Sequence, residues 1–131
     1  MYNGGVDDER ARLRELSRRL IRLHGLLLDR ERQAYERRHG AIPPADLFNL
    51  LLHDPQFAWL RSLSGMVARI DEQVDADGPL VPDAVERLFR EAYRLLKSDD
   101  RSAFHDKYRD ALQDSPDVVM AHADVSKVLT A

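Results

Sequence analysis

Residues 13–28, LRELSRRLIRLHGLLL, decide the fold. Leucine recurs in this stretch at steps of three and four residues, at positions 13, 16, 20, 23 and 27. Because an α-helix turns once in about 3.6 residues, this spacing places all five side chains on one face of a helix. The helical pattern extends outward from about Asp8 to His39, where Gly40 and Pro43-Pro44 predict its end. We therefore expect a long amphipathic first helix.

Turn-forming residues divide the rest of the chain into further helices. A short helix is expected from Ala45 to Leu52, and Asp54-Pro55 predicts the cap and first turn of the next helix, which extends to Val74. Later helices are expected to start at Pro82, after Ser98-Asp99-Asp100 and at Ser115-Pro116-Asp117. No stretch alternates between apolar and polar residues with the period of two that is typical of a strand.

These patterns predict an all-α protein. Short connections favour antiparallel neighbours, so we expect an antiparallel helical bundle of about four main helices plus short connecting helices. The chain has 131 residues, the length of one domain. We expect this single domain to span residues 1–131, with a disordered start at residues 1–8.

Composition narrows the functional classes. The chain contains no cysteine, which excludes disulfides, thiol nucleophiles and cysteine-ligated metal sites. Its net charge of −3 hides an uneven distribution, because residues 1–40 carry 10 basic and 7 acidic side chains whereas residues 41–131 carry 10 basic and 16 acidic ones. We interpret this division as a sign of complementary packing, within one chain or between two.

A track of polar residues interrupts the apolar face of the first helix. Ser17, His24, Glu31 and Arg38 follow one another at steps of seven residues. Polar groups that face a core need partners, so the track predicts either satisfied pairs that fix the helix register or a ligand site inside the bundle. His24 and Glu31 lie two turns apart, about 10 Å along the axis, which is too far for both to ligate one ion directly.

The histidines suggest a related alternative. His24, His53 and His122 lie on different segments, and the interior of a bundle can gather such residues around a metal or haem. The single tryptophan, Trp59, lies beside the apolar face of its own helix and could form the wall of such a cleft. Bundles with carboxylate-bridged metals repeat a Glu-x-x-His pair, whereas this chain has one copy, at residues 36–39. We predict no cofactor; the alternative is a bundle that holds a small ligand, metal or haem through these histidines with Glu31.

Arginines form a second stripe on the first helix. Arg12, Arg19, Arg30 and Arg37 project close to one line, away from the leucines. Such a stripe can contact phosphates. Acidic residues are interspersed at spacings that suit local ion pairs, which indicates a solvated face. We therefore expect no nucleic-acid partner; the second alternative is a nucleic-acid accessory protein that uses this stripe.

Other classes lack sequence support. The chain has no phosphate-cradling glycine-rich loop, no nucleophile elbow and no dinucleotide-binding fingerprint, so we expect no enzyme and no catalytic residue. Its uninterrupted apolar runs are only a few residues long, far short of a membrane span, so we expect no membrane partner. The first residues do not have the pattern of a secretory signal, which predicts a cytoplasmic location.

Three stretches carry a resemblance. Residues 23–32 (LHGLLLDRER), 53–60 (HDPQFAWL) and 115–119 (SPDVV) resemble small bacterial helical proteins of uncharacterised activity. This resemblance implies a bacterial origin. It implies no activity, partner or functional residue.

The functional prediction is a non-enzymatic interaction protein. Consecutive leucines at positions 26–28 widen the apolar face of the first helix beyond what one neighbouring helix covers. We therefore predict that the protein binds another copy of itself or another protein, with a homodimer expected. The candidate interface residues are Leu16, Leu23, Leu26 and Leu27.

Overall fold

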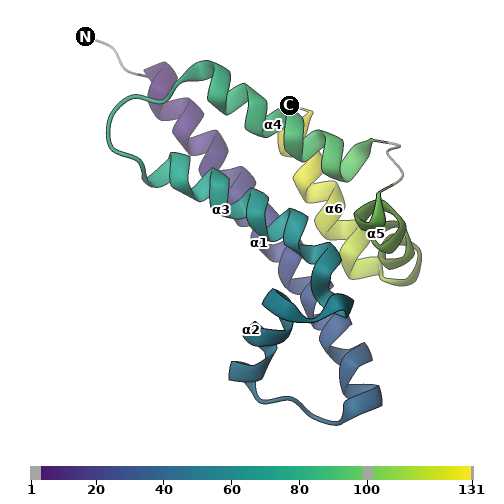
Figure 1. The fold of residues 1–131 in the computed structure, drawn as a ribbon. Helices are drawn as coiled ribbons and strands as arrows, with labels where there is room; N and C mark the ends of the chain where they lie inside the picture. The colour runs from purple at the N-terminus through teal and green to yellow at the C-terminus, as the bar shows by residue number, and fades with distance from the viewer. Residues whose placement is uncertain (1–3, 99–101, 131) are drawn as a thin grey trace.

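The computed structural model describes residues 4–98 and 102–130 (Figure 1). Within these residues the chain forms six α-helices, one 3₁₀ helix and no strand. The elements are α1 (Gly4–His39), α2 (Pro44–His53), η1 (Pro55–Leu60), α3 (Arg61–Asp75), α4 (Pro82–Lys97), α5 (Ala103–Asp114) and α6 (Pro116–Leu129). The all-α prediction is confirmed.

The long first helix begins earlier than its sequence pattern indicates. α1 starts at Gly4 rather than near Asp8, so residues 4–8 of the expected disordered start are helical, and residues 1–3 lie outside the described residues. Its end is as expected. Gly40 has a φ of 83°, and its N–H donates to the carbonyl of Glu36 at 2.8 Å. A left-handed glycine after the last turn is a common way to end a helix.

The bundle is built around α1. This helix of 36 residues is about 54 Å long at 1.5 Å per residue. α3 and α6 pack along it, and α4 packs against both α3 and α6 (Figure 1). These four helices are the main ones, and α2, η1 and α5 are the shorter elements, as the sequence predicts. None of the described helices combines the length and the apolar content that crossing a membrane requires.

The leucine face of α1 forms the core of a single chain. Leu16, Leu23 and Leu27 are fully buried within the chain, and Leu26 is partly buried against the same core. The prediction that these side chains form a dimer interface is therefore wrong for the three buried leucines. The reason is that α3 and α6 cover the wide apolar face together, whereas the prediction compared it with one neighbour.

Helix caps follow the sequence at two of the three expected sites. The Asp54 carboxylate accepts a hydrogen bond from the Gln56 N–H at 2.9 Å, although the turn that it caps is the 3₁₀ helix η1. Ser115 caps α6 through the Val118 N–H at 3.3 Å. For α5 the capping residue is Ser102, whose hydroxyl accepts a hydrogen bond from the His105 N–H. The sequence predicts this cap at residues 98–100, of which 99 and 100 lie outside the described residues.

Candidate functional site

The polar track of α1 forms a seam with α3 and η1. Ser17 donates to the Asp71 carboxylate at 2.5 Å. One step of seven later, His24 lies 2.7 Å from the Ser64 hydroxyl, and Ser64 is itself seven residues before Asp71. When polar residues recur every seven positions on two antiparallel helices, each one lies opposite a polar residue of the other helix. The seam is therefore the pattern expected of satisfied pairs that fix the register of α1 against α3.

The protonation of His24 follows from its neighbours. The Ser64 hydroxyl donates its single proton to the carbonyl of Leu60 at 3.0 Å, so it accepts from His24 Nε2. Burial lowers the pKa of His24, because the surrounding core disfavours the charged imidazolium. His24 is thus a neutral histidine with its proton on Nε2.

The next level of the seam brings Glu31 and Trp59 together. Trp59 Nε1 donates to one carboxylate oxygen of Glu31 at 3.1 Å, and Gln56 Nε2 donates to the other at 2.9 Å. Gln56 also contacts the carbonyl of Glu31 at 3.2 Å. Both carboxylate oxygens of Glu31 therefore have partners within the fold. Arg38, the last residue of the track, is exposed and has no partner among the described residues.

The three candidate histidines do not meet. His24 bonds to α3, whereas His122 Nδ1 is hydrogen-bonded to the Tyr108 hydroxyl at 2.6 Å between α6 and α5. His53 is exposed at the end of α2. Among the described residues, no group of three histidine or acidic side chains could hold a metal ion. The alternative in which these histidines hold one ligand or metal together is therefore wrong, because His24 and His122 contact different elements and His53 is exposed.

His122 and Tyr108 form a buried polar pair. Burial raises the pKa of the Tyr108 phenol, so the phenol keeps its proton while it is hydrogen-bonded to His122. Burial lowers the pKa of His122, and the positive charge of Lys97 adds to this effect. Like His24, His122 is held in its neutral form.

The arginine stripe is largely engaged within the fold. The Arg12 guanidinium lies 4.5 Å from the centre of the Phe89 ring, a cation–π contact with α4. Arg30 donates to the Asp114 carboxylate at 2.8 Å. Arg37 is exposed and has no partner among the residues that the structure describes. Three of the four arginines that were candidates for contacting phosphate, Arg12, Arg19 and Arg30, thus have partners within the fold.

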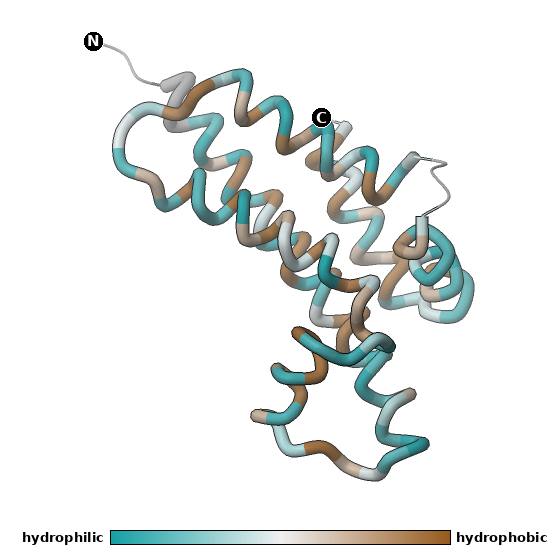
Figure 2. The backbone as a smooth tube through the Cα atoms, in the orientation of Figure 1, coloured by the Kyte–Doolittle hydropathy of each residue, from teal (hydrophilic) through white to brown (hydrophobic). Residues whose placement is uncertain are grey.

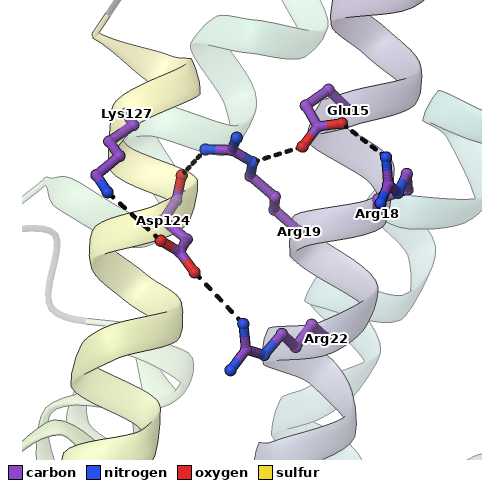
Figure 3. Close-up of polar contacts among 6 residues, drawn as sticks. All are labelled: Glu15, Arg18, Arg19, Arg22, Asp124 and Lys127. Carbon is purple, nitrogen blue, oxygen red and sulfur yellow. Dashed lines mark hydrogen bonds and ion pairs between the residues drawn. The ribbon is translucent and has the colours of Figure 1, made fainter.

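Arg19 belongs to a polar network between α1 and α6 (Figure 3). It donates to the Glu15 carboxylate at 2.8 Å and to the carbonyl of Asp124 at 2.6 Å. The Asp124 carboxylate also faces Arg22 at 3.4 Å and Lys127 at 3.7 Å. Exposed ion pairs contribute little stability each, but this network ties the two helices together at one level.

A hollow with a volume of about 690 Å³ lies between η1, α3, α4 and the start of α5. Trp59, Met66 and Phe104 form its apolar wall, and all three side chains also belong to the buried core. An ion pair between Arg69 and Glu91, at 2.9 Å, bridges α3 and α4 at its edge. An apolar wall with a charged edge suits the apolar part of a ligand or partner.

Sequence reasoning missed the exposure of α2. This helix has the sequence PADLFNLLLH, yet none of its ten residues is buried. Figure 1 shows α2 projecting from the bundle beside the end of α1, and Figure 2 shows its apolar colouring. The apolar residues of this helix are evident in the sequence, but a run of apolar residues does not by itself show whether another element covers the helix.

Comparison of the chain with protein-family models, curated proteins and solved structures finds no match. The residues described above therefore inherit no activity from a relative. The Ser17–Asp71, His24–Ser64, Glu31–Trp59 and Tyr108–His122 contacts are closed, because each of these side chains already has its partner. Features open to another molecule include the exposed face of α2, the hollow beside Trp59 and the basic residues near the end of α1.

Proposed function

We propose that this protein is a non-enzymatic interaction protein that self-associates through α2. One observation carries the proposal: the apolar helix α2 has no buried residue and packs mainly on η1. We retain the cytoplasmic location and bacterial origin expected from the sequence. The absence of a catalytic role is supported by the carboxylates of Asp71 and Glu31, which already accept hydrogen bonds from side chains of the fold.

The exposed side chains of α2 provide the driving force. Phe48 is 64% exposed and Leu52 is 45% exposed, whereas Phe57 in the adjacent η1 is fully buried. Burying one such side chain completely is worth about 1.5–3 kcal/mol. Leu47, Leu50 and Leu51 of α2 are partly buried against the core, whereas Phe48 and Leu52 stay exposed in the monomer and gain from being covered.

The charges around α2 favour a second copy as the occupant. Asp46 lies in the first turn of α2. At the other end, the Arg61 guanidinium donates to the carbonyls of Leu51 and Asp54 at 3.2 and 3.3 Å, beside the Asp54 carboxylate that caps η1. A two-fold axis that pairs two α2 helices antiparallel brings Asp46 of each copy toward Arg61 of the other. Their helix dipoles then oppose, which also favours this arrangement.

The test is the molar mass in solution. We expect light scattering to give the mass of two chains for the wild type at micromolar concentration, and of one chain for Phe48→Asp. Met120→Asp is the matched control, because Met120 is 62% exposed on α6, away from α2. A wild type with the mass of one chain, or equal effects of the two substitutions, would contradict the proposal.

A further inference from the structure

A second hollow, of about 410 Å³, lies between the last turns of α1, η1 and α5. Its lining is predominantly polar and contains four cationic side chains and two carboxylates, so its formal charge is +2. The cations are Arg30, Arg37, Arg38 and Lys107, and the carboxylates are Glu31 and Asp114. The positive charge around this hollow is therefore incompletely neutralised.

The two carboxylates already have partners. Glu31 accepts from Trp59 and Gln56, and Asp114 accepts from Arg30 at 2.8 Å. The remaining three cations have no counter-ion among the described residues: they are Arg37, Arg38 and Lys107. Like charges around one hollow repel each other, so bringing them together raises the free energy of the fold unless an anion binds there.

The register of α1 against α5 explains why cations from both helices line this hollow. Arg30 and Arg37 are seven residues apart on α1, and Lys107 and Asp114 are seven residues apart on α5. Arg30 pairs with Asp114. Two helical turns further along the same interface, Arg37 and Lys107 line the same hollow. The dipole of α1 accounts for an arginine in its last turn. It does not account for a lysine that α5 contributes to the same hollow.

We propose that this hollow binds a phosphate monoester group. Such a group carries about −1.5 to −2 charges at pH 7, which neutralises the formal +2 of the lining. The planar guanidinium of arginine forms two parallel hydrogen bonds with phosphate oxygens, and lysine adds a point charge. The ligand is either a free phosphomonoester or a phosphorylated residue of another protein.

Trp59 provides the readout, because it is the single tryptophan and bonds directly to Glu31 in the lining. The experiment measures tryptophan emission and binding heat at constant ionic strength. The ligands are inorganic phosphate, O-phosphoserine, a short peptide containing phosphoserine, and dimethyl phosphate as a tetrahedral monoanion. We expect saturable binding of the first three and weaker binding of dimethyl phosphate.

Two double variants complete the test. Arg37→Gln with Lys107→Gln removes two cations of the hollow, and we expect the affinity to fall by about tenfold or more. Arg14→Gln with Arg90→Gln is the matched control, because both residues are exposed and lie outside the hollow. Tighter binding of the peptide than of O-phosphoserine assigns the group to a protein partner, and the reverse assigns it to a small molecule. Absence of saturable binding, or equal loss in both variants, overturns the proposal.

Discussion

His24 Nε2 and Ser64 Oγ lie 2.7 Å apart, and the same serine hydroxyl donates its proton to the carbonyl of Leu60. The serine therefore has no proton left for the histidine, and the imidazole is the donor. Protonating His24 would place a positive charge at a level of the seam where no carboxylate contacts it. This pair makes the interface between α1 and α3 sensitive to acid.

We predict that the free energy of unfolding falls as the pH falls below about 6.5, the ordinary pKa of histidine. The folded-state pKa values of His24 and His122 are lowered by burial. In the window between the folded and unfolded pKa values, the unfolded chain binds more protons than the folded chain, so stability decreases with decreasing pH. Urea unfolding at a series of pH values between about 7.5 and 4.5 measures this slope.

The variant His24→Gln separates the two histidines. We expect it to flatten part of the slope, because glutamine keeps a donor near Ser64 but does not titrate. His53→Gln is the control, since His53 is exposed and outside the seam. A slope that is unchanged in His24→Gln would show that this histidine is not held neutral by the fold.

A second prediction concerns Glu31 and Trp59. Replacing Glu31 by Leu leaves the buried indole N–H and the Gln56 amide without their acceptors. Leaving such donors unpaired costs about 1–3 kcal/mol of stability. Glu31→Gln retains an acceptor oxygen and should lose less. Tryptophan emission reports the change directly, and an unchanged emission maximum in Glu31→Leu would contradict the contact.

Much of the fold could be predicted from the sequence because it depends on local spacing. The leucine steps in residues 13–28, the glycine after α1 and the Asp54 cap each act within one or two helical turns. The seam could be predicted in part: the steps of seven on α1 indicate polar positions on the core face. Their partners on α3 depend on the tertiary register, which local spacing does not define.

The rest could not be predicted because it depends on how elements meet. The sequence predicts a dimer through the leucines of α1 because it does not show that α3 and α6 share the same face. The apolar run of α2 resembles that of a buried helix, and only the tertiary structure shows that Leu47, Leu50 and Leu51 are partly buried whereas Phe48 and Leu52 are exposed. The basic hollow combines residues from opposite halves of the chain, such as Arg37 and Lys107.

Arg10 gives a third prediction, which sequence reasoning also missed. Its guanidinium donates to the carbonyls of Gln73 and Val74 at the end of α3, and of Ala76 and Gly78 in the loop that follows. These carbonyls would otherwise lack partners at the helix end. We expect Arg10→Ala to lower the free energy of unfolding by about 1.5 kcal/mol or more, since charge-assisted hydrogen bonds are lost.

Arg14→Ala is the control for that experiment. It lies one turn later on α1, is exposed, and has no hydrogen-bond partner among the described residues. A surface substitution of this kind changes stability by less than about 0.5 kcal/mol. Chemical unfolding of both variants measures the difference, and equal stabilities would refute the role of Arg10 as the cap of α3.

The two phenylalanines at positions 48 and 57 distinguish the core from the proposed contact surface. Phe57 is fully buried, so Phe57→Ala should cost about 3–5 kcal/mol at any protein concentration. Phe48 is 64% exposed, so in the monomer Phe48→Ala should change stability by less than about 0.5 kcal/mol. At concentrations where the wild type self-associates, the same variant should lose the extra stability that association adds by mass action. Urea unfolding at a low and a high protein concentration measures both effects. If Phe48→Ala destabilises the protein equally at both concentrations, α2 is covered within one chain and does not mediate self-association.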